Sequence, residues 1–571
     1  MKFSIPLRLP VRAVKRRPPT SPLSRLPVTL LPVSYDQQEF GDIVSDYEVD
    51  ITSTVPQRVR EQFEARNVEL AIPVPHVFIG YDNTVGNYRY VVVEPQPSQE
   101  VVNLYATLIS EIERLLLSNQ DPDLAFILLS LHERKRDVKV FEAEAPKYQL
   151  TTDAKVAMYY VVRNVFGYGV LTPALSDYRV EDISCNGLGL PVYVYHRDYE
   201  YIPTNLSFKD GELFGAKYSG QEFLDQTLLR LTSVAGKTVS VAEPIVDAML
   251  PNGDRLAATF GREVSKTGSS FVFRKFSESP ITVLDLIRSS VISPELAAYL
   301  WYAVDLRMSF MTIGVTGAGK TTMLNAFLNV VKDSNKIVTI EDIPEMRLVQ
   351  TNWVQLYSRQ AFGGTGKEIS LMDLLKLSLR YRPDMIVVGE IRGQEAYVLF
   401  QALSTGHGGA TTLHARDAES AVNRLLNEPM NIPQEWIPEM NIVINVRRLP
   451  LSQEGRMVLR RRVVSIDEVL SYREFSKVSV WEPSNDTHSF DLKAAKVLLS
   501  RAEALGREFD EVTREIERRA QYLKLLTTVR EVVQSRNSSR ELKKYVIEYS
   551  LNPEAALRKV TSMAALSSTP R

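Results

Sequence analysis

The sequence contains a single cysteine, Cys185, among 571 residues. One cysteine excludes an intrachain disulfide framework and favours a reducing compartment. No apolar run approaches the roughly 18 residues that a helix needs to span a bilayer. The 68 Lys and Arg residues against 69 Asp and Glu residues give a formal net charge of −1. The composition therefore gives no overall preference for nucleic acid, and it predicts a soluble or peripheral protein.

Acidic residues are also absent from the first 34 positions, where seven residues are basic and prolines recur. These prolines prevent a continuous helix, so we expect a disordered basic tail over residues 1–45. Two interpretations of this tail remain open. It is a solvated extension, or it contacts anionic lipid head groups or an acidic partner.

The most informative stretch runs from Phe310 to Asn325. An apolar, β-prone run enters the glycine-rich turn Gly314-Val-Thr-Gly-Ala-Gly-Lys-Thr321, and an apolar helical stretch follows. This is the order of strand, loop and helix that a phosphate-binding P-loop requires, and the alternative is a fortuitous glycine turn. Backbone N–H groups of such a loop surround phosphates, Lys320 neutralises the β- and γ-phosphates, and Thr321 can bind Mg²⁺. We expect nucleotide contacts from Gly314, Thr316, Gly317, Ala318, Gly319, Lys320, Thr321 and Thr322.

The patterns around this loop predict an α/β fold with several segments. A chain of this length is expected to form three or four domains. Strand and helix signals alternate from residue 281 onward, as in a parallel sheet with crossover helices. We expect a basic tail over 1–45, an N-terminal packing or docking module over 46–150, an α+β domain over 151–280, a RecA-like P-loop core over 281–490 and a helical region over 491–571.

Two acidic stretches follow predicted strands of the core. Glu341 and Glu345 lie in Glu-Asp-Ile-Pro-Glu, and Glu390 follows the apolar run 385–388. Carboxylates at strand ends can hold Mg²⁺ or orient an attacking water, although without a P-loop they would be solvated strand ends. Glycine stands at position 389, where many P-loop proteins have aspartate, so Mg²⁺ would depend more on Thr321, water and other carboxylates.

Two of the six histidines, His407 and His414, flank the segment 408–413. No cysteine and no recognisable third ligand accompanies them, so a metal site explains them poorly. A histidine that senses the γ-phosphate from a strand end fits the context better. A pair of structural, hydrogen-bonded histidines is the alternative.

Three arginines, Arg255, Arg262 and Arg274, lie on or between predicted strands before the core. Taken one at a time, they are ordinary surface charges.

The four motifs together resemble those of the secretion ATPases of type II and type IV systems. These are GVTGAGKTT from Gly314, EDIPE from Glu341, IVVGEIRG from Ile386 and GHGGATTLHA from Gly406. The resemblance extends from about residue 177 to residue 448. Stretches at 191–197, 201–205, 242–247 and 270–275 are most similar to the archaeal branch, which includes motor ATPases of the archaellum and of archaeal pili.

The resemblance implies a hexameric ring with nucleotide bound between the α+β domain and the P-loop core. Arg255, Arg262 and Arg274 would then reach the phosphates. Glu345 would orient the water, Glu390 would support Mg²⁺ partly through water, and Glu341 would belong to the same acidic cluster. The assignment between Glu345 and Glu390 stays open. His414 and His407 would couple the phosphate state to domain position.

The motifs and the resemblance together thus lead us to expect a Mg²⁺-dependent ATPase, which the resemblance implies is hexameric and acts at the cytoplasmic face of the membrane. It would assemble, rotate or retract a pilus-like filament, or drive secretion, through a polytopic membrane platform protein. Nucleic acid is an unlikely partner on composition, but a DNA translocase or recombination motor remains the alternative because RecA-like cores also handle DNA. A nucleotide-binding scaffold with negligible turnover is a third possibility.

Overall fold

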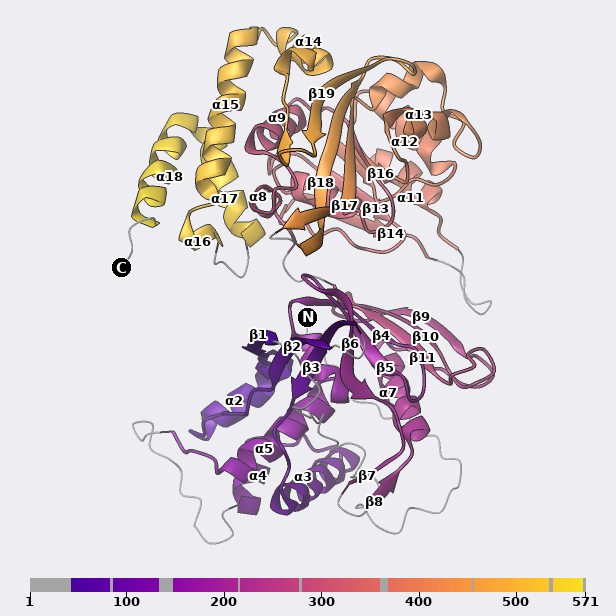
Figure 1. The fold of residues 1–571 in the computed structure, drawn as a ribbon, viewed down its shortest axis with the longest axis vertical. Helices are drawn as coiled ribbons and strands as arrows, with labels where there is room; N and C mark the ends of the chain where they lie inside the picture. Colours follow the sequence, from indigo (N-terminus) through magenta and orange to yellow (C-terminus); the bar gives the residue numbers. More distant parts are fainter. Residues whose placement is uncertain are drawn as a thin grey trace. The chain divides into compact units, whose positions relative to one another are not determined.

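The computed structural model describes residues 43–82, 86–132, 147–213, 216–276, 280–359, 368–453, 456–533 and 538–567. The chain divides into two compact units, Met1–Ser277 and Glu278–Arg571 (Figure 1). Most of the expected basic tail, residues 1–42, lies outside the described residues. Residues 43–45, the end of that tail, form the start of strand β1 instead.

The first unit is built on a nine-stranded sheet. Its order is β1-β2-β3-β6-β5-β4-β11-β10-β9, antiparallel except for the parallel pair β3 and β6. The strands are β1 (Ile43–Glu48), β2 (His76–Asp82), β3 (Asn87–Val93), β4 (Val180–Cys185), β5 (Pro191–His196), β6 (Glu200–Ser207), β9 (Ile245–Met249), β10 (Arg255–Thr259) and β11 (Ser270–Arg274), with the separate hairpin β7 (Gly211–Leu213) and β8 (Ala216–Tyr218). The boundary proposed at residue 150 thus falls between strands of one continuous sheet.

Two helices of the first unit, at 172–176 and 220–234, share an apolar cluster with the sheet, and the other helices form a second cluster among themselves. They are α2 (Gln57–Ala65), α3 (Gln99–Leu117), α4 (Leu124–His132), α5 (Thr152–Val161), α6 (Thr172–Ser176) and α7 (Gly220–Val234). Ser98 begins α3 as its N-cap, because its side chain accepts from the backbone N–H of Val101. A buried ion pair between Glu94 and Arg163 joins the end of β3 to the π-turn after α5.

The second unit has a mixed sheet in the order β14-β13-β15-β16-β12-β17-β18-β19-β20. The first six strands are parallel: β14 (Trp353–Tyr357), β13 (Ile337–Glu341), β15 (Met385–Val388), β16 (Gly408–Leu413), β12 (Phe310–Ile313) and β17 (Ile442–Gln453). The last three are antiparallel: β18 (Arg456–Val469), β19 (Phe475–Glu482) and β20 (Thr487–His488). Strands that the sequence pattern predicts at 310–313, 337–340, 385–388, 410–413 and 441–446 correspond to β12, β13, β15, β16 and β17.

Helices pack on both faces of this sheet, because its parallel strands are apolar on both sides. In β15, Met385 and Val387 belong to one apolar cluster, whereas Ile386 and Val388 belong to the other. The first cluster includes α8 (Val283–Arg288), α9 (Pro294–Asp305), α10 (Lys320–Leu328), α14 (Lys496–Glu503), α15 (Phe509–Leu526), α16 (Arg530–Val533), α17 (Ser538–Leu551) and α18 (Pro553–Ser567). The second includes α11 (Leu371–Ser378), α12 (Glu395–Ser404) and α13 (Ala418–Leu426). This three-layer α/β arrangement is the RecA-like core that the sequence predicts.

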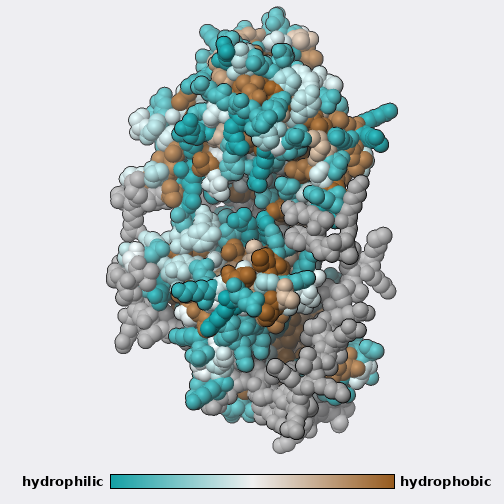
Figure 2. All heavy atoms as spheres, turned by 90° about the vertical axis from the view of Figure 1, so that its right-hand side faces the viewer, coloured by the Kyte–Doolittle hydropathy of each residue, from teal (hydrophilic) through white to brown (hydrophobic). Residues whose placement is uncertain are grey.

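On the face shown in Figure 2, hydrophilic residues predominate among the coloured atoms, and hydrophobic areas lie between them. Within the described ranges, no helix is both long and apolar enough to cross a membrane.

Candidate nucleotide site

The glycine-rich loop joins β12 to α10 at the carboxyl edge of the parallel sheet. Gly314 has φ 155° and packs so closely on β17 that an added Cβ would lie 2.3 Å from the carbonyl oxygen of Val446. Gly319 is left-handed, with φ 98°, and directly precedes the first residue of α10. Thr316 and Gly317 are exposed, whereas Ala318 is buried. The loop therefore presents its backbone at a helix N-terminus, which is the requirement for binding phosphate.

Lys320, the first residue of α10, lies close to His414 and Glu390, which follow the ends of β16 and β15. Lys320 Nζ lies 3.3 Å from His414 Nδ1, and His414 Nε2 lies 3.0 Å from Glu390 Oε1. Lys320 Nζ is also 3.4 Å from His414 Nε2, so the amine lies close to both ring nitrogens. Among the described residues no hydrogen bond reaches Glu390 Oε1, which is buried, so its approach to His414 is an electrostatic contact. Lys320 also donates to the carbonyl oxygen of Val315 at 3.3 Å. The predicted lysine, histidine and glutamate thus form one chain of contacts, which we call the Lys320–His414–Glu390 chain.

Burial lowers the pKa of both basic members of this chain. For Lys320, desolvation is the larger effect, and the charges of Glu390 and Glu345 oppose it. For His414, desolvation is followed by the nearby charge of Lys320, so the pKa falls below its ordinary value of 6.5. The lowered pKa favours the neutral imidazole.

Glu341 is buried behind the loop that carries Glu345. Its Oε1 accepts from the backbone N–H groups of Glu345 and Met346, each at 2.8 Å, and its Oε2 accepts from Gln355 at 2.9 Å. Burial raises the pKa of this carboxyl group, while these hydrogen bonds lower it. Glycine at 389 leaves room for it, because an added Cβ would lie 3.3 Å from Glu341 Cγ. Glu341 therefore holds the Glu345 loop, and Glu345 itself is exposed.

The donor set fits Mg²⁺ when the ion is bound together with phosphate. Thr321 and Thr322 are half-buried in the first turn of α10, and the carboxylate of Glu390 lies at a neighbouring strand end. In the described part of the chain, no three His, Cys, Asp or Glu side chains form a metal-binding group. Mg²⁺ suits this pattern, since it is commonly held by one or two carboxylates, water and substrate phosphates.

The structure does not bring His407 to the loop. His407 lies before β16, at the end opposite to His414, and about 20 Å separates the two along the strand. Its Nδ1 is within 3.1 Å of the carbonyl oxygen of Ala402 and of the Thr405 hydroxyl. The expectation that His407 contacts nucleotide is therefore replaced by a structural role at the end of α12.

The three expected arginines belong to the first unit. Arg255 and Arg274 are direct cross-strand neighbours on β10 and β11. Arg255 pairs with Asp247, with a shortest distance of 2.7 Å, and Arg274 pairs with Asp182 at 3.0 Å. Arg262 is exposed in the turn after β10. That these three arginines contact the phosphates of a bound nucleotide stays a proposal.

Two other arginines lie at the site but were not expected from the sequence. Arg392 Nη2 is 2.5 Å from Glu390 Oε2, and this contact raises the pKa of Arg392. Arg461, on β18, donates from Nε to the carbonyl oxygen of Gly317 at 3.3 Å. Arg392 lies within the motif that carries Glu390, so proximity in sequence could have indicated it. The only signal for Arg461 is the unusual run of three arginines at 460–462 within an apolar strand pattern.

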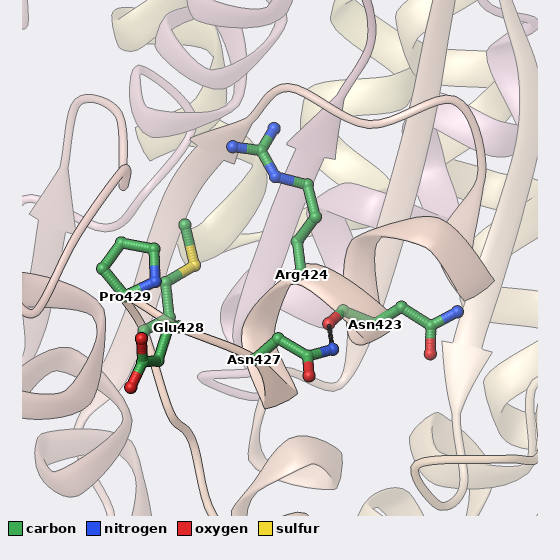
Figure 3. A pocket seen from close by; sticks show the side chains of 6 residues that line it. Asn423, Arg424, Asn427, Glu428 and Pro429 are labelled. Carbon is green, nitrogen blue, oxygen red and sulfur yellow. Dashed lines mark hydrogen bonds between the residues drawn. The ribbon is translucent and has the colours of Figure 1, made fainter.

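A shallow pocket lies beside the site, at the end of α13. It is lined by Asn423, Arg424, Asn427, Glu428, Pro429 and Met430. In Figure 3 the amide of Asn427 points to the backbone of Asn423, and the guanidinium of Arg424 points away from both. Arg424 Nη1 donates to the carbonyl oxygen of His414. This arginine thus connects the pocket wall to the backbone of the Lys320–His414–Glu390 chain.

The fold and this site define a P-loop nucleotide-binding protein of the α/β class. The model of the family "Type II/IV secretion system protein" matches residues 209–482. An uncharacterised protein of Methanocaldococcus jannaschii is 36% identical over 395 residues, which are 67% of this chain and 69% of that protein. A second protein of that organism is 44% identical over 250 residues, 42% of this chain and 90% of its own length. A putative conjugal transfer protein of Mycobacterium tuberculosis is 33% identical over 264 residues, 44% of this chain and 70% of its own.

The solved structures that match this chain have lower sequence identities and low TM-scores. The VirB11 ATPase of the Brucella suis type IV secretion system is 23% identical, with a TM-score of 0.25, and covers 52% of this chain and 94% of its own. The Legionella pneumophila ATPase DotB is 15% identical, with a TM-score of 0.37, and covers 66% and 93%. Alignments this loose assign no function. The sequence relatives and the family match show that the chain belongs to the type II/IV secretion system protein family, and the relatives in M. jannaschii agree with the archaeal branch.

Proposed function

We propose that this protein is a hexameric ATPase whose hydrolysis cycle drives assembly, rotation or retraction of a type IV pilus-like filament, or type II-like secretion. The Lys320–His414–Glu390 chain beside the P-loop is the observation that carries this proposal. It provides a cation for the β- and γ-phosphates and a neutral histidine that contacts both that cation and a carboxylate.

In this mechanism the loop from Gly314 to Thr321 binds the triphosphate, and Lys320 leaves His414 to contact the phosphates. Glu345, held by Glu341, orients the attacking water, and Glu390 is the second candidate for that role. Thr321 and Glu390 would hold Mg²⁺, partly through water, and the ion would neutralise phosphate charge. Lys320 would contact the γ-phosphate when ATP is bound and return to His414 after the phosphate leaves. The contact between Lys320 and His414 would therefore depend on whether the γ-phosphate is present. Arg255, Arg262 and Arg274 would approach the phosphates in the assembled ring.

The proposed partners follow from the family. The ring would act on a polytopic membrane platform protein from the cytoplasmic side of the membrane. The basic residues before position 34 would add contacts to anionic lipid.

Phosphate release with Mg-ATP tests the enzymatic part. We expect Lys320→Ala to lower kcat at least about 100-fold, because it removes the principal cation from the site. Lys332→Ala is the matched control, since Lys332 is an exposed lysine in the same unit, 3.9 Å from Asp305. Equal turnover in wild type and Lys320→Ala would refute the assigned site, provided that both unfold at the same temperature.

Light scattering with and without ADP tests the ring, because the proposal requires six copies in at least one nucleotide state. Stimulation of turnover by anionic liposomes, by the platform protein or by DNA then separates a filament motor from a DNA translocase. Strong, salt-sensitive stimulation by DNA alone would favour the translocase.

A further inference from the structure

The hairpin of β17 and β18 passes directly beside the phosphate loop. β17 pairs in parallel with β12 as far as Ile313 and Asn445. The loop then leaves the sheet, while β17 continues past it to Val446, whose carbonyl oxygen faces Gly314. Residues of β18 that pair with this part of β17 therefore lie next to the loop.

Arg461 is the residue of β18 that contacts the loop. Its Nε donates to the carbonyl oxygen of Gly317 at 3.3 Å, and its Cδ would lie 3.2 Å from a Cβ added to Gly319. The side chain is exposed. It thus lies along the segment whose N–H groups surround the α- and β-phosphates in a P-loop.

The charges around Arg461 favour an anion. Its direct cross-strand neighbour is Arg448, and like charges in this position repel each other. The next residue, Arg462, is neutralised by Asp486 through contacts at 2.6 and 2.7 Å. Within the described ranges, no carboxylate pairs with Arg461. A guanidinium held against a phosphate loop with no carboxylate partner there is suited to bind phosphate oxygens.

We propose that Arg461 is a nucleotide-binding residue that exchanges its contact with the Gly317 carbonyl for the α- and β-phosphates of a nucleotide bound to the same subunit. This inference rests on the proposed function, because it assumes that the loop binds a nucleoside di- or triphosphate. It adds to the loop a cation from β18, which lies two strands away from β12 in the same sheet. Because Arg461 would not contact the γ-phosphate, its loss should weaken the binding of ADP and of ATP by the same factor.

Calorimetric titration of the full chain with Mg-ADP and with Mg-ATP at two salt concentrations tests this role. Arg461→Gln keeps a side-chain donor near the loop but removes the charge, and we expect about 10- to 100-fold weaker binding of both nucleotides. The loss of affinity in Arg461→Gln, relative to wild type, should be larger at low salt than at high salt. Arg461→Lys keeps the charge, so its loss of affinity should be smaller than that of Arg461→Gln. Arg473→Gln removes an equal charge from the turn after β18, where Arg473 lies over the ring of Tyr472, and should bind as wild type does.

Three outcomes would overturn the inference. Arg461→Gln could bind ADP within twofold of wild type. Arg461→Lys and Arg461→Gln could be equally impaired with no change in salt dependence, which would mean that Arg461 only positions the loop. ATP alone could be weakened, which would place Arg461 at the γ-phosphate. Absence of nucleotide binding by wild type would instead refute the proposed function itself.

Discussion

The Oε1 atom of Glu341 accepts a hydrogen bond from the backbone N–H of Glu345 at 2.8 Å. Glu341 is 2% exposed, whereas Glu345 is exposed to solvent. Two carboxylates of one short motif therefore have different tasks. The buried one shapes the loop, and the exposed one is free to meet a ligand.

Substitution of these two glutamates should separate stability from turnover. Glu341→Gln replaces one carboxylate oxygen with an NH₂ group, either the one that accepts from Gln355 or the one that accepts from both loop N–H groups. We expect a loss of about 1 to 3 kcal/mol in unfolding free energy and a lower kcat. Glu345→Gln should lower kcat without a loss of stability, because Glu345 is exposed. Urea unfolding and phosphate release measure the two effects, and equal stability of both variants would contradict the assignment.

The sign of the pH dependence follows from His414. Burial and the charge of Lys320 lower the pKa of His414 in the folded protein below the ordinary value of 6.5. As pH falls below about 6.5, the unfolded chain binds a proton at this position before the folded chain does. The stability contribution of neutral His414 is thus fully present above that pH, and it is lost as pH falls toward the folded pKa.

His414→Gln should therefore remove part of the stability loss between pH 7.5 and pH 5. The measurement is urea unfolding of wild type and variant at several pH values. Turnover of wild type should also fall on the acid side, because protonated His414 would place a second positive charge next to Lys320 and disturb its position at the phosphates. The same pH profile of stability in both proteins would show that His414 is not neutral in the folded state.

The sequence was sufficient for the parts of this site that lie in contiguous motifs. The apolar runs at 310–313 and 385–388 predict buried parallel strands, and their carboxyl ends place Lys320 and Glu390 at one edge. Arg461 could not be placed in this way, because it lies 144 residues from Gly317 and reaches it through the pairing of β17 with β18. His407 was misplaced because a motif does not show which residues precede a strand and which follow it.

Non-local pairing also explains what was missed in the first unit. The β-prone runs at 77–79 and 88–93, with Asp82, Asn83 and Gly86 between them, predict a hairpin, and β2 and β3 pair antiparallel. That β3 then pairs in parallel with β6, through Tyr90 and Thr204, depends on a contact between segments more than a hundred residues apart. Alternation of apolar residues predicts each strand but contains no information on its partner.

The pair of Glu94 and Arg163 should be important for the stability of the first unit. Both side chains are fully buried, 2.7 Å apart, and Tyr159 also donates to Glu94 at 2.6 Å. Arg163→Met leaves a buried carboxylate without its cation, so we expect a loss of about 3 to 5 kcal/mol.

The exposed pair of Arg58 and Asp121, 2.6 Å apart, provides the control. Arg58→Met should cost less than about 1 kcal/mol, because exposed ion pairs contribute little. Chemical unfolding followed by circular dichroism measures both. Similar losses in the two variants would show that the Glu94–Arg163 pair is not buried as described.

Two glycines of the phosphate loop should respond differently to alanine. At Gly314 a Cβ would lie 2.3 Å from the carbonyl oxygen of Val446 and 3.0 Å from the Cβ of Ala318. Strain and overpacking then add, and we expect Gly314→Ala to cost about 3 kcal/mol. At Gly317 nothing lies within 4 Å of the added Cβ, so only the left-handed backbone, with φ 75°, opposes alanine. That cost is about 1 to 2 kcal/mol. Unfolding without nucleotide measures both, and a Gly317→Ala variant as unstable as Gly314→Ala would contradict the close contact between the loop and β17.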